Sequence, residues 1–537
     1  MRRFPGFALS QISASVLAAM AAPAFAALGL MQVPPTSVTP PPPNVIVTLD
    51  DSGSMTGEIP YDPTETYIVP PGSNGLQFRA DTTLPRAYSN AYANTNTVRL
   101  NTNDVAQRFR DAYGALTDDV QRRNYINWYG FYRTRQMAMK ASVMTAFSPS
   151  IVPDGRFRVA WQALNNICSG STFPLNNTCA QSRSIQSFEG AHRDAFFTWV
   201  QQVGASGGTP LRAAYRRAGN YMLTTGVGSP WADRPTPMSS ASEAPILSCR
   251  RSYHVMFTDG QWNEGAAGYG NADNQARVLP DGTAYTVTAP YRGPNNGGDQ
   301  NLSDVAFQYW ATDLQTGPGW INNVPKITKQ SGTETYGTTT LDEYWNPKNN
   351  PATWQHLVLY GIGFGEAGDL TNPAWGGNTT AGPAFAQIVS GTRQWPSLPE
   401  GGTLTNREYD LWHAAVNTRG DLFPATDQKA LTSAFQRIVA EILAQNAATG
   451  GAASALTTSA SDFKVVRAGF DATPTFRGVV QGFGLTNGAI STIASWNAQT
   501  VVSAQNPDSR VILTASTPLT GVPFRWASLS AYMQTAL

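Results

Sequence analysis

The chain has 537 residues and a formal net charge of +1, and charged side chains make up only 14% of it. This balance excludes the basic surplus of a nucleic-acid-binding protein and the acidic excess of a disordered tail. With 48 glycines and 37 prolines, the composition indicates packed domains joined by long polar loops.

The first 26 residues have the pattern of a secretory signal peptide. Two arginines open the chain, an apolar stretch occupies residues 7–25, and Ala24 and Ala26 fit the small-x-small cleavage rule. A membrane anchor is the alternative, but serine and glutamine interrupt the apolar stretch. We expect export with cleavage, no membrane span in the mature chain, and a stiff proline-rich lead-in over residues 27–43.

The three cysteines agree with export. Cys168 and Cys179 lie close together in a polar loop, which suits a local disulfide in an oxidising compartment. Cys249 is either unpaired or bonded to one of these two. A zinc site is the alternative, but the sequence has no CxxC pair and no histidine near these cysteines.

From residue 44 onward, predicted strands alternate with predicted helices. Short apolar runs bounded by turn residues indicate buried strands, while residues 60–104 show no sustained period and should form an ordered surface insertion. Strands are expected at 44–50, 157–161, 252–258 and 356–363. Helices are expected at 125–147, 189–203, 210–221, 302–314, 382–391, 408–417 and 427–445.

This alternation predicts an α/β fold, with a doubly wound, mostly parallel sheet that carries helices on both faces and large loop insertions. One such domain should span residues 44–446. Residues 447–461 have the composition of a linker, and residues 462–537 are rich in valine, phenylalanine, threonine and glycine without a helical period. We therefore expect a short β-rich C-terminal segment.

Oxygen-bearing side chains gather where the predicted strands end. Asp50, Ser52 and Ser54 alternate along the turn after the first strand, Thr209 precedes a predicted helix, and Asp259 follows a later strand. In a doubly wound sheet, ligands bind beyond the carboxyl ends of the strands, so these five residues can face one point. Hard oxygen ligands without sulfur or imidazole predict a divalent cation, Mg²⁺ first, with Mn²⁺ and Ca²⁺ as alternatives.

Other interpretations of these residues are weaker. Asp, Ser and Gly also populate ordinary turns. Residues 51–54 match the aspartic protease signature, but Asp259 lacks the neighbouring Ser or Thr that a second half-site needs. A subtilisin-like arrangement lacks its histidine motif, and none of the four histidines has a partner at metal-ligand spacing. We therefore expect no enzymatic activity and no catalytic residues.

This set of residues resembles a von Willebrand factor A domain with a metal-ion-dependent adhesion site. Asp50, Ser52 and Ser54 match its D-x-S-x-S motif, Thr209 matches its distant threonine, and Asp259 matches its distant aspartate. The resemblance implies that the hydroxyls contact the metal directly and that the aspartates act mostly through water. Neutral hydroxyls quench little of the cation's charge, so an open position would attract a partner's acidic group.

Longer segments are similar to the PilC/PilY family of type IV pilus tip proteins. They follow in order over about residues 43–537, and the tryptophan-rich ones are more specific than the metal motif. The segments are residues 43–55, 207–221, 247–260, 304–314, 323–325, 352–356 and 410–417.

This resemblance implies a pilus biogenesis factor and tip adhesin, exported to the periplasm and displayed at the pilus tip on the cell surface. Its partners would be minor pilins, the tip complex and a host-cell or abiotic surface. The alternative role is structural, in pilus priming or mechanosensing, with the metal only stabilising the fold. Longer family members continue into a C-terminal β-propeller, which is lacking here, so a chain ending at Leu537 is either truncated or a short relative.

Overall fold

In a computed structural model, the chain divides into two compact units, of which one is Pro40–Ala447 and the other contains Ala448–Leu537. The structure describes residues 40–71, 77–78, 97–98, 107–165, 185–225, 229–232, 246–260, 262–263, 270–294, 301–365, 382–398, 407–445, 453–459, 462–471, 477–486, 489–504, 506, 513–517, 520–523, 525–528 and 534. The expected signal peptide, most of the lead-in, both Cys168 and Cys179, and most of the expected insertion at 60–104 lie outside them.

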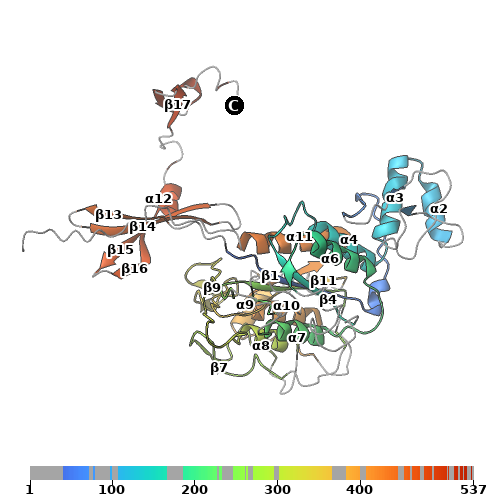
Figure 1. Ribbon diagram of the computed structural model, residues 1–537, viewed down its shortest axis with the longest axis horizontal. Helices are drawn as coiled ribbons and strands as arrows, with labels where there is room; N and C mark the ends of the chain where they lie inside the picture. Colours follow the sequence, from blue (N-terminus) through green and yellow to red (C-terminus); the bar gives the residue numbers. More distant parts are fainter. Residues whose placement is uncertain are drawn as a thin grey trace, which may run out of the picture. The chain divides into compact units, whose positions relative to one another are not determined.

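A six-stranded sheet forms the centre of the larger unit, and three of its strands, β1, β4 and β11, are labelled in Figure 1. The strand order is β12-β11-β6-β1-β4-β5. All neighbouring strands are parallel except β5, which runs antiparallel to β4. The strands are β1 (Asn44–Leu49), β4 (Arg158–Ala163), β5 (Gln186–Ser187), β6 (Ser252–Thr258), β11 (Val358–Phe364) and β12 (Asp421–Ala425). The fold is therefore mixed α/β with a mostly parallel central sheet, as the alternating pattern predicts.

Helices cover both faces of this sheet because its strands are apolar on both sides. In β1, Val45, Val47 and Leu49 belong to one core, whereas Ile46 belongs to the other, as the two-residue period of a strand requires. The first core is closed by α3 (Asp119–Phe131), α4 (Arg135–Ala146), α6 (Gly190–Gln202) and α11 (Gln428–Gln445). The second is closed by α7 (Leu211–Met222), α8 (Leu302–Trp310), α9 (Pro383–Val389) and α10 (Arg407–Asn417).

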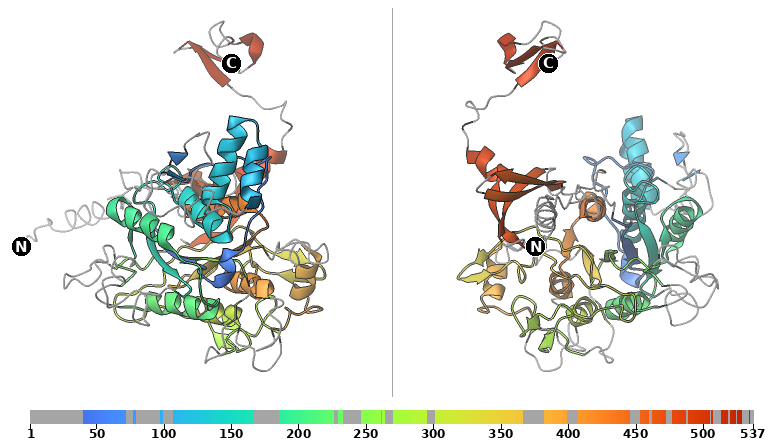
Figure 2. Two further views of the ribbon diagram at one scale, coloured as in Figure 1. Left: turned by 90° about the vertical axis from the view of Figure 1, so that its right-hand side faces the viewer. Right: turned by 60° about the vertical axis from the view of Figure 1, so that its left-hand side comes forward.

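Smaller elements decorate the larger unit. Helix α2 packs on α3 through the edge-on rings of Phe109 and Tyr129, and the two lie side by side in cyan in Figure 2. The remaining elements are η1 (Gly53–Thr56), β2 (Gln77–Phe78), β3 (Thr97–Val98), α2 (Gln107–Ala115), β7 (Arg277–Val278), β8 (Ala284–Tyr285), β9 (Glu334–Tyr336) and β10 (Thr339–Leu341). Within the described residues, no helix combines the length and apolar character that a membrane crossing requires.

The C-terminal unit is rich in β-structure, as expected from its composition. Four antiparallel strands form one sheet in the order β13-β14-β15-β16, and β17 and β18 form a separate hairpin. Its elements are β13 (Ala453–Ser459), β14 (Asp462–Asp471), β15 (Arg477–Thr486), β16 (Ala489–Asn497), α12 (Ala498–Ala504), β17 (Leu513–Thr517), β18 (Thr520–Pro523) and η3 (Trp526–Ser528).

Two expectations about these elements need correction, and one strand was missed. The linker expected at 447–461 contains a strand, β13, whose residues pair with β14. The single helix expected at 125–147 is two helices, because Thr134 adopts an extended conformation and caps α4 through the N–H of Met137. The sequence analysis predicts no strand over Asp421–Ala425, but these residues form β12. It is an edge strand, where Pro424 is tolerated.

Candidate functional site

The predicted residues lie at the point where the strand order of the sheet reverses. Strands β4 and β5 extend the sheet from one side of β1, and β6, β11 and β12 extend it from the other. The loops that follow β1 and β6 therefore diverge from each other at the carboxyl ends of these two strands. Doubly wound sheets bind ligands at such a point. Asp50 directly follows β1 and Asp259 directly follows β6, so the topology brings both carboxylates to this edge.

Asp50 is fully buried and held by two hydrogen bonds. Its Oδ1 accepts the backbone N–H of Ser52 at 2.7 Å, and its Oδ2 accepts the hydroxyl of Thr258 at 2.7 Å. Burial raises the pKa of Asp50 to about 6, and the nearby charge of Asp259 acts in the same direction, against the hydrogen bonds from Ser52 and Thr258. Two buried carboxylates thus lie close enough to repel each other.

A chain of hydroxyls connects the turn after β1 to Asp259. Ser54 donates from Oγ to Asp259 Oδ1 at 2.7 Å, and its Oγ lies 2.8 Å from Ser52 Oγ. Ser52 and Asp259 are buried, whereas Ser54 is exposed. Four of the five predicted residues therefore meet in one hydrogen-bonded cluster that reaches the surface at Ser54.

Thr209 reaches the same cluster through its loop. Gly53 donates its N–H to Gly207 O at 3.1 Å, and Ser206 donates its N–H to Asp51 O at 2.6 Å, so the backbones of the two loops are joined. Thr209 is buried. Among the described residues, its hydroxyl makes no hydrogen bond to the other four predicted residues.

Two asparagines that the sequence analysis did not identify hold these loops in place. Asn165, after β4, donates from Nδ2 to Gly208 O at 2.6 Å and to Asp51 Oδ1 at 3.0 Å. Asn263, after β6, accepts the N–H of Thr209 at 2.8 Å. A Cβ at Gly208 would lie 2.8 Å from Asn263 Oδ1, so any larger residue there would displace the side chain that holds Thr209. Both asparagines lie in loops that follow strands of the sheet. This position in the sequence is the signal that could have identified them.

Arg135 is the other residue that the sequence did not suggest. It is the first residue of α4, and its Nη1 lies 3.0 Å from Asp259 Oδ2. The arginine side chain is 29% exposed, whereas the Asp259 side chain is fully buried. Asp259 therefore accepts from Ser54 on one oxygen and from a cationic side chain on the other.

The donor set fits a hard divalent cation. The cluster offers two buried carboxylates and the hydroxyls of two serines, without sulfur or imidazole. The part of the chain that the structure describes contains no group of three or more His, Cys, Asp or Glu residues arranged to hold a metal. Any cation here would therefore depend on the hydroxyls.

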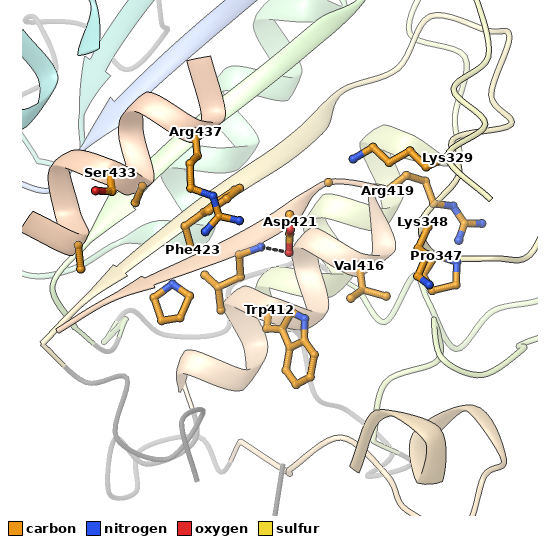
Figure 3. Close-up of a pocket in the computed structure, with 15 residues that line it drawn as sticks. Lys329, Pro347, Lys348, Trp412, Val416, Arg419, Asp421, Phe423, Ser433 and Arg437 are labelled. Atoms are coloured by element: carbon orange, nitrogen blue, oxygen red, sulfur yellow. Dashed lines mark hydrogen bonds between the residues drawn. The ribbon is translucent and has the colours of Figure 1, made fainter. Parts of the chain in front are cut away.

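A cavity of about 420 Å³ lies elsewhere, along the edge strand β12 (Figure 3). Two of its basic side chains already have acidic partners, since Lys329 pairs with Glu441 and Lys348 with Glu334. The predicted residues do not line it. The lining residues are Lys329, Pro347, Lys348, Trp412, Val416, Arg419, Gly420, Asp421, Leu422, Phe423, Pro424, Ala430, Ser433, Ala434 and Arg437.

The chain is similar over nearly its whole length to curated proteins named type IV pilus biogenesis factor PilY1. It is 33% identical over 599 residues to that of Pseudomonas aeruginosa strain PAO1, covering 98% of this chain and 50% of the relative. The values for strain PAK are 32% over 607 residues with the same coverage. For strain UCBPP-PA14 they are 30% over 592 residues, with coverage of 96% and 48%.

No family model matches the chain. Two crystal structures of the pilus adhesin SpaC from Lactobacillus rhamnosus GG align with 84% of this chain and with 44% and 43% of their own, at 10% and 9% identity. Their TM-score of 0.27 is too low to carry an argument about fold or function. The chain spans about half the length of the curated relatives it matches. On this similarity, the chain belongs to the PilC/PilY family of type IV pilus biogenesis factors.

Proposed function

We propose that this protein is a type IV pilus biogenesis factor and pilus-tip adhesin that binds acidic groups of a partner or surface through a divalent cation. The cation, Mg²⁺ in the first place, is held at a von Willebrand factor A-like metal-ion-dependent adhesion site. Its residues are Asp50, Ser52, Ser54, Thr209 and Asp259. The protein acts outside the cytoplasm at the pilus tip, with minor pilins as partners and without catalysis.

The meeting of Ser52, Ser54 and Asp259 in one hydrogen-bonded chain is the observation that carries this proposal. These residues come from loops more than 200 positions apart, and they converge where the strand order reverses. The relatives' name, pilus biogenesis factor, gives the biological setting. When bound, the cation would supply an electrophilic position for a partner's carboxylate. The neutral serine hydroxyls would leave most of its charge available.

A second function, in which the metal only stabilises the fold, is favoured by the burial of the site. Asp50 and Asp259 are fully buried and Ser52 is 1% exposed, so the surface opening of the cluster is at Ser54. A cation that neutralises two buried carboxylates lowers the cost of burying their charge. This role needs no ligand from a partner.

Ser54→Ala tests the proposed site with little risk to folding, because Ser54 is exposed. We expect the variant to bind Mn²⁺ at least about tenfold more weakly than the wild type in isothermal titration calorimetry, because one oxygen ligand is lost. Surface attachment should fall in parallel. Ser150→Ala is the matched control, since it removes another exposed hydroxyl, which contacts Ser148 Oγ at 3.0 Å. Equal Mn²⁺ affinity in both variants would disprove the site.

Chelation separates the two functions. If the cation binds a partner, EDTA abolishes attachment while the melting temperature changes little. If the cation is structural, EDTA lowers the melting temperature, and attachment is lost only at temperatures where the protein unfolds. Both readouts use the full chain with and without added Mg²⁺.

A further inference from the structure

Arg135 contacts the carboxylate oxygen of Asp259 that Ser54 leaves free. Its Nη1 lies 3.0 Å from Asp259 Oδ2 and 3.5 Å from the Asp259 carbonyl oxygen. The other carboxylate oxygen, Oδ1, accepts the hydroxyl of Ser54. A fully buried carboxylate needs a compensating charge, and the guanidinium of Arg135 supplies one.

The loops around Arg135 leave space for its side chain to reach Asp259. A Cβ at Gly57 would lie 3.0 Å from Arg135 Nε, and a Cβ at Gly365 would lie 3.3 Å from its Nη2. The backbone N–H of Arg135 also donates to Gly57 O at 2.9 Å. Two glycines from separate segments thus leave room for the arginine to reach Asp259, while its partial exposure leaves a route back to solvent.

We propose that Arg135 competes with the divalent cation for Asp259 and thereby sets the metal affinity of the site. The inference rests on the proposed function, because it concerns the same cation. Two positive charges at one carboxylate repel each other, so the metal weakens the hold of Arg135 on Asp259 and Arg135 weakens that of the metal. This coupling is reciprocal, and the bound cation leaves the guanidinium free to turn toward solvent.

The test compares Arg135→Gln with Arg135→Lys in the full chain, using Mn²⁺ alone as the probe. Removing the positive charge should tighten Mn²⁺ binding on the order of tenfold, within the usual range of such couplings. Arg135→Lys keeps the charge and should stay close to the wild type. Arg122→Gln is the matched control, because Arg122 pairs with Asp119 on the surface of α3.

A second readout does not depend on metal affinity. Without metal, Arg135→Gln should melt at a lower temperature than the wild type, because Asp259 loses its counter-charge. Saturating Mn²⁺ should largely remove this difference, because the cation then compensates Asp259. An unchanged or weaker Mn²⁺ affinity, or a melting deficit that Mn²⁺ does not reduce, would show that Arg135 is only a structural ion pair.

The design also separates this inference from the proposed function. If the wild type binds Mn²⁺ and Arg135→Gln binds it no more tightly, the competition is disproved and the site stands. If the wild type does not bind but Arg135→Gln does, the competition is supported, and the proposed metal-dependent function of the wild type falls. If neither protein binds Mn²⁺, both proposals fall.

Discussion

At the scale of single residues, polar side chains on the strands of the central sheet are buried with specific hydrogen-bond partners. His254 Nε2 lies 2.7 Å from Thr48 Oγ1, and Gln162 Nε2 donates to the same oxygen at 2.9 Å. Burial lowers the pKa of His254 to about 3, so the ring is neutral at physiological pH. Thr48 therefore links three neighbouring strands, because it contacts His254 of β6 on one side and Gln162 of β4 on the other.

Lys140 is a fully buried lysine whose effect on stability can be measured. Its Nζ donates to Gln201 O at 2.8 Å, and burial lowers the pKa of Lys140 to about 7. Between pH 7 and about 10 the unfolded chain holds a proton on this lysine that the folded protein lacks. The free energy of unfolding should therefore rise with pH in this window, by about 1.4 kcal/mol per unit from this group.

Lys140→Met removes the pH-dependent contribution of this lysine to the free energy of unfolding. We expect the stability of the variant relative to the wild type to decline steadily from pH 7 to pH 10, as measured by urea unfolding at several pH values. Lys429→Met, which removes an exposed lysine paired with Glu65, should show no such trend. A constant difference between Lys140→Met and the wild type would mean that Lys140 stays charged inside the fold.

Residue types and their spacing identify the carboxylates and hydroxyls of the candidate site, but not the partners that orient them. The turn after β1 and the aspartate after β6 could be found because strand ends are visible in the sequence. Arg135 lies 124 positions from Asp259, and no local pattern relates the two. Such partners depend on how α4 packs against the sheet edge, which is a tertiary property.

At the scale of elements, the buried strands and the C-terminal helix of the larger unit could be predicted closely, but edge strands and the break between α3 and α4 could not. The strand expected at 252–258 and the helix expected at 427–445 agree with β6 and α11 to within one residue. In contrast, β12 and the two-residue β5 are edge strands, whose short runs give little signal. The break between α3 and α4 depends on Thr134, whose capping role competes with a continuous apolar pattern.

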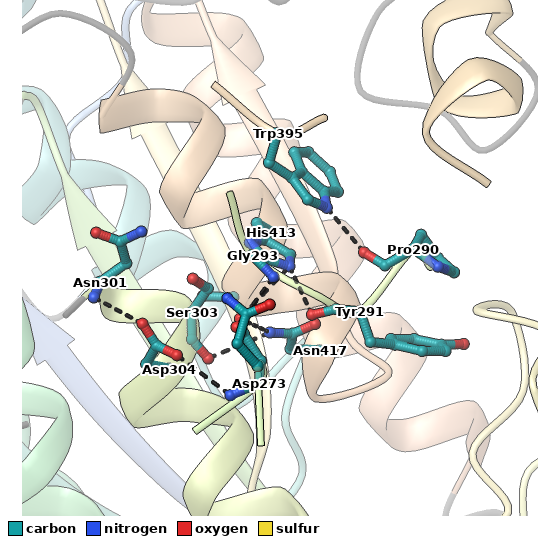
Figure 4. A network of polar contacts seen from close by, with 12 residues as sticks. Asp273, Pro290, Tyr291, Gly293, Asn301, Ser303, Asp304, Trp395, His413 and Asn417 are labelled. Atoms are coloured by element: carbon teal, nitrogen blue, oxygen red, sulfur yellow. Dashed lines mark hydrogen bonds and ion pairs between the residues drawn. The ribbon is translucent and has the colours of Figure 1, made fainter. Parts of the chain in front are cut away.

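The N-terminus of α8 is held by a buried acidic network (Figure 4). Asp304 accepts the N–H of Asn301 at 2.9 Å, as part of a capping box with that residue, and it also accepts the N–H of Asp273 at 3.2 Å. Asn417 and Gly293 donate in turn to Asp273. Burial raises the pKa of Asp304 to about 7 and also raises the pKa of the adjoining Asp273, so the folded network holds its protons more tightly than the unfolded chain does.

The sign of the resulting pH dependence follows from this shift. The raised pKa of Asp304 adds to the free energy of unfolding, and this addition is fully present below pH 4. It is lost as the pH rises through about 7, because the unfolded chain releases this proton at a lower pH than the folded protein does. Asp304→Asn has no carboxyl group at this position, so the variant does not undergo the loss of stability with rising pH that Asp304 causes. We therefore expect the variant to gain about 2 kcal/mol in relative stability between pH 5 and pH 8, as measured by urea unfolding.

Asp342→Asn is the control for this prediction. Asp342 also accepts a backbone N–H, from Trp345 at 2.8 Å, but it is exposed. Its substitution should cost similar stability at both pH values. If Asp304→Asn behaves in the same way, the carboxyl group of Asp304 is ionised throughout this range and the network stabilises its charge.

At the scale of the whole molecule, the candidate site lies entirely within the unit Pro40–Ala447. Both cores that flank the central sheet also belong to this unit, and a unit with its own cores should fold alone. Expressed separately, residues 40–447 should therefore bind Mn²⁺ with the affinity of the full chain. Residues 448–537 should not bind it.

Thermal unfolding checks this division. At a concentration 100 times its dissociation constant, Mn²⁺ adds about 2.7 kcal/mol to the free energy of unfolding of the unit that binds it. The melting temperature of residues 40–447 should therefore rise by as much as the melting temperature of the corresponding transition in the full chain. Ser54→Ala in the isolated unit should reduce this rise at the same Mn²⁺ concentration. If only the full chain responds, the site needs the C-terminal unit, and metal binding is then a property of both units together.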